Sequence, residues 1–406
     1  MMPPQPRAPT QSAVAPVPLP KRRRISRTTG YVLGLWLAGV FVTSALARIF
    51  LREVDFLDAL LASAGLWPVL YFTFSRNRFF PKRIDTDVKV ALTVFMAFAG
   101  ASVFVSPIPL ISVSYYFLTL GALFLSLQFN SALTPAQYET GFKIYAFCAM
   151  IALVAFAAYD YVPGVRLGNG KGILNPNSIG LVSMSAITAA FAIRRTWLRI
   201  CIMAPTVMVL ILTDSRSAAL ASLVAILIVL FIRTKAGSSR RLITIFFWSA
   251  AVGIIAILNL DAIVHHAESF FAIHNRYRGI GTGATGRLEA WTATWALFLS
   301  HPIVGVGFRA HEHFITVESS SHNGYIAMFA EIGLFGTLAV FYFVAAGLRN
   351  LLRQTKQADT MWSGTILLGI CIGYLIIAVF ERYLLNMGNP TSLIFLLGIM
   401  QQRSRT

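Results

Sequence analysis

The chain has 406 residues, of which 56% are hydrophobic and 12% charged, and its mean hydropathy is +0.69. A soluble domain carries about twice that charged fraction, so these values exclude an ordinary soluble enzyme and indicate a polytopic membrane protein. The formal net charge of +18 gathers in the tails and short loops of one side of the membrane, which argues for contact with anionic membrane lipids and against a nucleic-acid partner.

The amino-terminal segment, residues 1–29, is expected to be a disordered, basic cytoplasmic tail. Residues 1–20 are rich in Pro, Ala and Gln, which is typical of disordered chains, and the basic run KRRRISR (Lys21–Arg27) follows them. The apolar run that comes next is too long for a signal peptide and lacks a convincing cleavage site. We therefore expect a retained anchor whose amino terminus lies inside the cell.

Apolar runs of about 16 to 24 residues, the length that crosses a bilayer core, recur along the rest of the chain. They predict an all-α membrane domain over residues 30–402, with about twelve transmembrane helices and both termini on the cytoplasmic side. The expected spans are 30–51, 56–74, 88–106, 108–127, 141–159, 178–193, 198–213, 217–232, 242–259, 323–348, 361–380 and 391–402.

The loops on the two sides of this predicted topology differ in charge and in length. The inside loops SRNRFFPKR, RRTWLR, RTKAGSSRR and RNLLRQTK and the tail RSRT are all basic. Most outer connections are short, but one runs over about residues 260–322 and contains all seven histidines of the chain, from His265 to His322. We therefore expect any chemistry to take place at the outer face.

The first motif on that face is TDSRSAAL (Thr213–Leu220), a tight turn between two predicted spans. Arg216 stands at the turn, with Ser215 and Ser217 as candidate N-caps of the following helix. An arginine on the outer side breaks the positive-inside trend. One interpretation is an arginine that snorkels to the headgroup layer. The other is an anion clamp, because guanidinium and the free N–H groups of a helix start both suit phosphate oxygens.

The second motif is GRLEAWTATWALFLSHPIVGVGF (Gly286–Phe308). Its tryptophans and other large apolar residues fall on one face at helical spacing, which predicts a helix in the membrane interface that begins at Arg287. The sequence HPIVGVGF then ends this helix. Gly305 and Gly307 would let the backbone approach a ligand closely, although a plain turn explains the same pattern.

The third motif is SSSHNGYIAMFAEIGLFG (Ser319–Gly336), in which three serines, His322 and Asn323 precede an apolar helix that contains Glu331. The serines are suited to cap this helix. The positive end of the helix disfavours an imidazolium ion, so a neutral His322 would be able to accept a proton as a general base. The alternative is an interfacial histidine that bonds to backbone.

A fourth outer segment, RLGNGKGILNPNSIG (Arg166–Gly180), is rich in Gly and Asn. Arg166, Lys171, Asn175 and Asn177 have side chains that suit a sugar or a phosphate, and a turn is an equally good interpretation.

No metal site is expected from the acidic residues and histidines. HEH (His311–His313) places its histidines at i and i+2, which do not share a helical face, and His265 and His266 are the other histidines considered with them. Metal-dependent oligosaccharyltransferases of similar architecture carry E/D-x-D in the first outer loop, and Glu53 and Asp55 fit that spacing here. We interpret these two as ordinary loop acids beside Arg52.

Together the motifs resemble those of the O-antigen ligase and polymerase superfamily of bacterial envelope glycosyltransferases. The strongest match is H-N, a nine-residue spacer and G-x-x-G, which here are His322, Asn323, residues 324–332, Gly333 and Gly336. The SRS turn, the GRxxxW helix start and P-x-x-G-x-G-F (residues 302–308) precede it in the expected order. The motifs cover roughly residues 165–340, and the predicted topology extends the resemblance to most of the chain.

The resemblance implies a GT-C-like fold without metal or other cofactor, in the bacterial inner membrane, with the 260–322 loop and the active site facing the periplasm. The donor would be a glycan on undecaprenyl pyrophosphate, and the acceptor a hydroxyl of lipid A-core or of another glycan. Carried onto this chain, Arg216 and Arg287 would bind the donor pyrophosphate and His322 would activate the acceptor, so these three are the expected catalytic residues. Glu381, at the outer end of a span, is a candidate to orient His322, with a pairing to Arg382 as the alternative.

The function expected from these residues is O-antigen ligase-like transfer, with inversion at the anomeric carbon because a single base and no neighbouring carboxylate pair stand out. The substrate-binding candidates are Asn323, Gly305, Gly307, Arg166, Lys171, Asn177 and Glu381. A repeat-unit polymerase, a protein O-glycosyltransferase and a twelve-span transporter remain alternatives. A transporter of two repeats usually has its long loop inside and central, unlike this chain.

Overall fold

The computed structural model describes residues 28–50, 65–74, 85–235, 287–315, 320–382, 384–385 and 387–401. These residues form helices and connecting loops with no strand among them, which confirms the predicted all-α class over the described part of the chain. Residues 1–27 of the predicted tail and the predicted span at 242–259 lie outside the described residues, whereas Thr28 and Thr29, which end the predicted tail, lie in the first turn of α1. The α-helices are α1 (Thr28–Phe50), α3 (Pro68–Phe74), α4 (Thr86–Val103), α5 (Pro109–Ala132), α6 (Pro135–Asp160), α7 (Pro176–Ala189), α8 (Thr196–Leu212), α9 (Arg216–Lys235), α12 (Arg287–Ser300), α13 (Gly324–Gln354), α14 (Met361–Phe380) and α15 (Pro390–Ile399).

Several helix starts follow directly from the local sequence. A proline occupies the first turn of α5, α6, α7 and α15, where its fixed φ suits the helix and its missing N–H costs nothing. Thr134 and Gln137 form a reciprocal capping box at the start of α6. The side chains of Asn175 and Asn389 cap α7 and α15.

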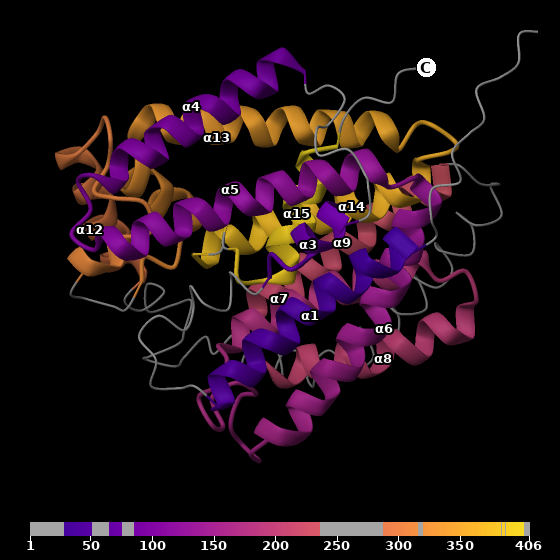
Figure 1. Ribbon diagram of the computed structural model, residues 1–406. Coiled ribbons are helices and arrows are strands. Elements are labelled where there is room, and N and C mark those ends of the chain that lie inside the picture. Colours follow the sequence, from indigo (N-terminus) through magenta and orange to yellow (C-terminus); the bar gives the residue numbers. More distant parts are fainter. Residues whose placement is uncertain are drawn as a thin grey trace, which may run out of the picture.

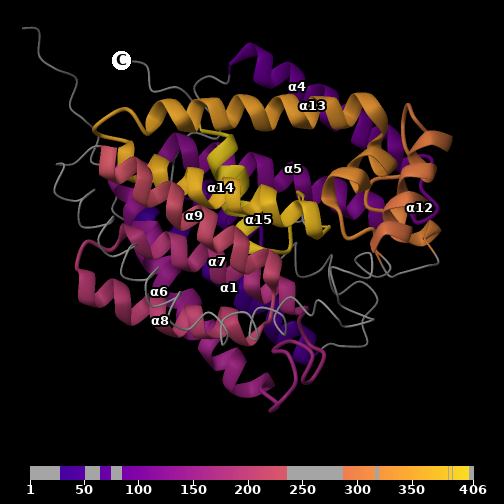
Figure 2. The ribbon, with the colours of Figure 1, turned by 180° about the vertical axis from the view of Figure 1, so that it is seen from behind.

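The helices pack lengthwise into one bundle (Figure 1). The long helix α13 lies along α4, α1 packs on α6, and α9 packs on α14. The view from behind shows α7, α9, α14 and α15 side by side across the middle of the bundle (Figure 2). Helix α12, the short 3₁₀ helix η3 (His311–Phe314) and the start of α13 gather at one end, so the residues of the second and third motifs share that end.

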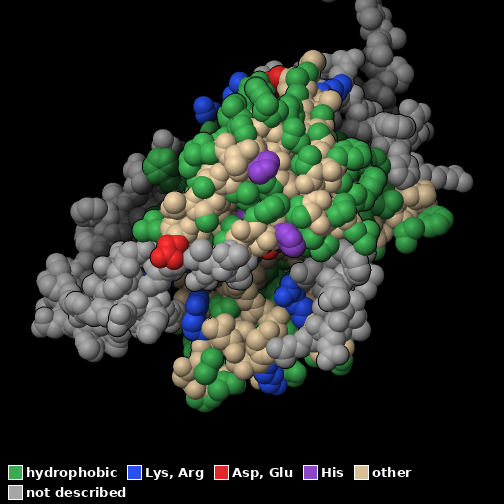
Figure 3. Space-filling view, turned by 90° about the vertical axis from the view of Figure 1, so that its left-hand side faces the viewer, with side chains coloured by type: hydrophobic (Ala, Val, Ile, Leu, Met, Phe, Trp, Pro, Cys, Tyr) green, Lys and Arg blue, Asp and Glu red, His purple; other side chains and the backbone are tan. Residues whose placement is uncertain are grey.

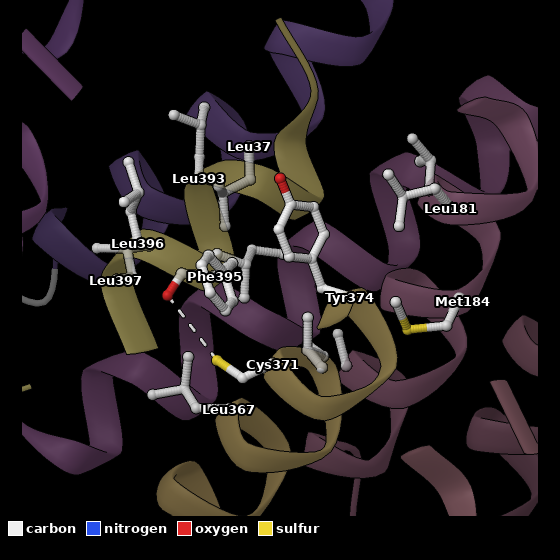
Figure 4. Packing of buried hydrophobic residues seen from close by; sticks show 14 of the residues in the cluster. Leu37, Leu181, Met184, Leu367, Cys371, Tyr374, Leu393, Phe395, Leu396 and Leu397 are labelled. Carbon is white, nitrogen blue, oxygen red and sulfur yellow. Dashed lines mark hydrogen bonds between the residues drawn. The ribbon is translucent and has the colours of Figure 1, made fainter. Parts of the chain in front are cut away.

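Helices α1 and α6 approach closely through small residues. A Cβ atom on Gly30 would lie 2.7 Å from the Gln137 carbonyl oxygen, and one on Gly34 would lie 2.6 Å from the Gly141 carbonyl oxygen. Only glycine at these positions allows the two backbones to meet, as is common where membrane helices associate. Elsewhere large side chains fill the centre of the bundle: the rings of Tyr374 in α14 and Phe395 in α15 lie 4.6 Å apart between their centroids (Figure 4).

Seven of the described helices are long and apolar enough to cross a membrane: α1, α4, α5, α6, α9, α13 and α14. Helices α8 and α15 are apolar but shorter. The chain is therefore an integral membrane protein. The predicted span at 361–380 coincides with α14, and that at 323–348 lies within the described extent of α13 apart from its first residue. The count of twelve spans, the GT-C-like arrangement and the periplasmic loop stay predictions.

Candidate functional site

Glu381, the residue that follows α14, connects the chain's predicted site residues. Its side chain is almost completely buried and accepts a hydrogen bond from Asn177 Nδ2 at 2.5 Å and one from Arg287 Nη2 at 3.2 Å, both at Oε1. His322 Nδ1 lies 3.5 Å from the other carboxylate oxygen. A buried carboxylate is stable only with such partners. The Glu381 cluster, meaning Glu381, Asn177, Arg287 and His322, is thus a polar site among the packed helices.

Each member of the Glu381 cluster comes from a helix end. Asn177 lies in the first turn of α7, Arg287 is the first described residue of α12, and His322 lies two residues before α13. The amino-terminal ends of these helices carry positive partial charge, which favours the carboxylate they surround. The end of the molecule that holds α12 presents histidine, basic and acidic side chains at its surface among apolar ones (Figure 3).

His322 is held in an unusual backbone conformation. Its φ is 47°, in the left-handed region that non-glycine residues seldom adopt. Asn323 follows as the N-cap of α13, where its Oδ1 accepts from the N–H groups of Tyr325 at 2.9 Å and Ile326 at 3.1 Å. The prediction that serines cap this helix is therefore wrong, because Asn323 occupies the N-cap position directly before α13. Asn323 thus has a structural role as the N-cap, and its predicted contact with substrate stays a prediction.

The TDSR turn is tied to the same cluster. The Ser215 hydroxyl donates to Asn177 Oδ1 at 2.8 Å, and Asn177 in turn donates to Glu381. Arg166 binds the turn from outside, donating to the carbonyl oxygens of Thr213 at 2.9 Å and Asp214 at 3.1 Å. The first residue of α9, Arg216, is half-buried beside this turn. Arg166 thus supports the turn that presents Arg216.

The glycines of the HPIVGVGF loop approach the protein's own backbone. Gly305 and Gly307 have φ of 77° and 123°, and a Cβ atom on either would collide with the Glu331 backbone or with Ser106. The loop docks on a break in α13 at Gly333, whose φ is 70°. Val306 N donates to the Ala330 carbonyl at 2.8 Å, an acceptor that the break releases from the helix. The structure places these glycines in packing, and their predicted ligand contact stays a prediction.

Lys171 lies apart from the Glu381 cluster. Its backbone N–H donates to Asp160 Oδ1 at 2.9 Å, and its ammonium lies 3.5 Å from the centroid of the Tyr159 ring. Among the predicted residues of that outer loop, only Asn177 reaches Glu381. The pairing of Arg382 with Glu381, the alternative considered from the sequence, is not found among the described contacts, because Arg382 turns to Glu312 and Glu331.

A second buried cluster lies directly beside the first, and the sequence motifs do not predict it as a cluster. His311 Nδ1 lies 2.6 Å from Glu331 Oε1, and His311 Nε2 lies 3.1 Å from the Ser321 hydroxyl. Arg382 forms ion pairs with both Glu331 and Glu312. The signal that pointed here was Glu331, an acidic residue inside an apolar helix. We call these residues the His311 cluster.

Burial and charge set the protonation of the His311 cluster. Burial lowers the pKa of His311, although the hydrogen bond to Glu331 opposes this effect. Burial alone would raise the pKa of Glu312, but the interactions with Arg382, His311 and Ser320 together outweigh burial, so the pKa lies below its ordinary value. Within the described residues no group of three His, Cys, Asp or Glu is placed to hold a metal ion, and His265, His266, Glu53 and Asp55 lie outside them.

Comparison with known proteins relates part of this chain to a protein family. A search among curated proteins finds no match to the chain. A family described as O-antigen ligase matches residues 200–341, which contain Arg216, Arg287, the HPIVGVGF loop and His322. The match agrees with the resemblance seen in the order and spacing of the motifs. The match covers residues 200–341 and supports the O-antigen ligase superfamily for this part of the chain.

Proposed function

We propose that the protein transfers a glycan from a polyprenyl-pyrophosphate carrier to a hydroxyl group, with the Glu381 cluster as its active site. The observation that carries the proposal is a single buried carboxylate that contacts a histidine and an arginine together. A glycan transfer needs a base for the acceptor and a cation for the leaving pyrophosphate, and Glu381 holds one of each. The O-antigen ligase family acts on glycans, which supports the same reaction class.

His322 is the proposed base. Its Nδ1 faces Glu381, so a Nδ1–H proton directed at that carboxylate leaves Nε2 as the acceptor for a substrate proton. The 3.5 Å separation is long for a hydrogen bond, and catalytic contacts often shorten when substrate binds. As Nε2 takes the acceptor's proton, the imidazolium that forms is stabilised by Glu381. The side chain is partly exposed, as a base that meets substrate must be.

Arg287 and Arg216 are the proposed partners of the pyrophosphate. The acceptor oxygen forms a bond to the anomeric carbon while the bond from that carbon to the pyrophosphate oxygen breaks, and the electron pair stays on the departing oxygen. Guanidinium groups at helix starts stabilise this charge without a metal. Arg287 uses one of its five N–H donors on Glu381, so others can reach a phosphate oxygen. One base on the side opposite the leaving group gives inversion.

The acceptor we favour is a hydroxyl of lipid A-core, as in ligation, at the periplasmic face of the bacterial inner membrane with undecaprenyl pyrophosphate as the released product. The acceptor is tested by a lipopolysaccharide gel and glycan blot on a deletion strain, the complemented strain and a His322→Ala strain. Loss of glycan from lipid A-core, with long glycan still on the carrier, supports the ligase.

Two other gel patterns would redirect the proposal. A single repeat unit on the core in the deletion strain would mean a polymerase of the same superfamily. An unchanged ladder would mean another polysaccharide or a protein acceptor, and release of polyprenyl pyrophosphate by purified protein would then be measured directly. Wild-type activity in His322→Ala protein would reject the mechanism, provided that the variant inserts and accumulates like the wild type.

A further inference from the structure

The His311 cluster is joined to the Glu381 cluster through two pairs of neighbouring residues. Ser321 contacts His311, and the next residue, His322, contacts Glu381. Arg382 contacts Glu331, and the residue before it, Glu381, contacts His322. The dipeptide Ser321–His322 therefore faces the dipeptide Glu381–Arg382. The contacts of Ser321 and Arg382 within the His311 cluster hold the same two backbone segments that the His322–Glu381 contact must bring together.

We infer that His311 is a positioning residue for the His322–Glu381 contact. It bridges the two segments by a chain of contacts: Ser321 to His311 at 3.1 Å, His311 to Glu331 at 2.6 Å, and Glu331 to Arg382 at 3.4 Å. The inference rests on the proposed function of the Glu381 cluster, and it assigns to His311 the placement of the base.

Backbone geometry explains why the segment needs such a clamp. His322 has a φ of 47°, which a non-glycine residue holds only when its surroundings impose it. The neighbouring Ser321 hydroxyl supplies that constraint, because it lies within hydrogen-bonding distance of His311 Nε2 and of the Asn323 carbonyl at 3.3 Å. Without His311, the Ser321 hydroxyl in this short turn loses its contact with the imidazole.

Ser321, His311 and Glu331 are arranged as in a nucleophilic triad, but their burial excludes that chemistry. Ser321 and His311 are 0% exposed and Glu331 is 1% exposed, so no substrate reaches the serine oxygen. The charges that act on His311 are those of Glu331 from α13, Arg382 just after α14 and Glu312 beside it in η3. Arg309 in turn interacts electrostatically with Glu331, Glu312 and Arg382. With Arg309 included, two arginines balance two glutamates, so a neutral His311 leaves these charged groups without net charge.

Two substitutions of His311 each retain one of its two side-chain contacts and remove the other. In His311→Gln the amide group lies near the position of Nε2 and retains a partner for Ser321. In His311→Asn the shorter amide lies near Nδ1 and retains a partner for Glu331 only. The readout is the rate at which diethyl pyrocarbonate modifies His322 in the purified full-length protein, followed by peptide mass spectrometry. This measurement needs no substrate and no turnover.

The expected result is a several-fold change in the modification rate of His322 in His311→Asn, because the imidazole is no longer held against Glu381 and its exposure and basicity change, and a rate near that of the wild type in His311→Gln. Ser321→Ala should reproduce the asparagine variant with a smaller change to the core, and it replaces that variant if the latter does not fold. Tyr145→Phe is the matched control, because it removes a buried hydroxyl contact of 2.6 Å to Ser185 elsewhere in the bundle. It should leave the His322 rate unchanged.

Turnover supplies a second, separate readout. Misplacement of a base by about 1 Å costs on the order of 10²-fold in rate, so His311→Asn should lower kcat with little effect on KM for the lipid-linked donor. Equal His322 modification rates in wild type, His311→Asn and Ser321→Ala would overturn the inference. A changed modification rate in a protein that shows no glycan transfer would uphold the positioning of His322 and reject only the proposed function.

Discussion

At the scale of single residues, Glu381 has a place that no other acidic residue among the described ones shares. It receives Asn177 and Arg287 on one carboxylate oxygen and faces His322 with the other. Its neighbour Arg382 faces away toward Glu331 and Glu312. The chain thus separates two adjacent charges of opposite sign into two buried clusters, and each charge meets its counterions there.

Glu381→Gln is expected to lower glycan transfer on the order of 10²-fold, because the amide neither stabilises a protonated His322 nor holds Arg287 by charge. The measurement is release of polyprenyl pyrophosphate by the purified protein at saturating donor. Glu289→Gln is the control, since it removes an exposed carboxylate from the first turn of α12. Equal rates in the Glu381 variant and the wild type would contradict the assigned role.

His311 makes stability depend on pH. Its pKa in the folded protein is below the ordinary value of 6.5, so below that pH the unfolded chain binds a proton that the folded chain does not. Stability should therefore fall as the pH drops from 6.5 toward 5, and the loss attributable to Glu312 begins only below 4.5. Thermal unfolding in detergent checks this. His311→Gln should flatten the dependence in the upper window, whereas His313→Gln, at an exposed neighbour, should retain it.

At the scale of elements, the break in α13 at Gly333 positions the site. The break frees carbonyl groups that the loop 302–307 binds, and this loop leads on to η3, which carries His311. Leu334 N completes the joint by donating to the Pro302 carbonyl at 2.8 Å. The second and third motifs are therefore one structural unit, although they are separate in sequence.

Gly333→Ala is expected to destabilise the protein by roughly 1 to 3 kcal/mol or more, because a side chain there is strained at φ 70° and meets the backbone of Ile303. The measurement is the midpoint of thermal unfolding in detergent. Gly39→Ala in α1 is the control, since a Cβ atom there meets nothing within 4 Å. It should be neutral or slightly stabilising, because alanine favours a helix. Equal midpoints for both variants would contradict the role of Gly333.

Much of the helical framework was predictable because a membrane helix is a long apolar run, and such runs are visible in sequence. The ends of α14 follow from this alone. The predicted topology makes Glu381 a candidate partner of His322, but the contact with Asn177 was not predictable from spacing, because Asn177 lies 204 residues before Glu381 and only the packing of α7 on α14 joins them. The break at Gly333 was also hidden, since it depends on a docked loop. Asn323 and the serines are all good caps by composition, and only geometry chooses among them.

At the scale of the whole molecule, helix α13 runs along the bundle, and its length separates the two ends of the bundle. This helix has 31 residues and so spans about 46 Å. The Glu381 and His311 clusters lie at the end where α13 begins. Arg353 and Lys356 lie at the other end, where basic side chains are expected to face the cytoplasm.

Single cysteines are expected to label from opposite sides of the membrane. In a background with Cys148, Cys201 and Cys371 replaced by alanine, His313→Cys should react with a membrane-impermeant maleimide once the outer membrane is permeabilised. Lys356→Cys should react only after the inner membrane is also opened. Both side chains are exposed, so the labelling depends on whether the reagent can cross the membrane and not on burial of the cysteine. Labelling of Lys356→Cys in cells with an intact inner membrane would reverse the proposed orientation.

The late position of Glu381 in the chain has a consequence for biosynthesis. At about 5 to 20 residues per second, the ribosome reaches this carboxylate roughly 10 to 40 seconds after Asn177, and Arg287 and His322 emerge in between. Until then the nascent protein contains the side chains of Asn177, Arg287 and His322 without the carboxylate that contacts all three. Under the proposed mechanism, activity begins only when α14 has been made and inserted, so a chain interrupted before this point is expected to be inert toward the donor.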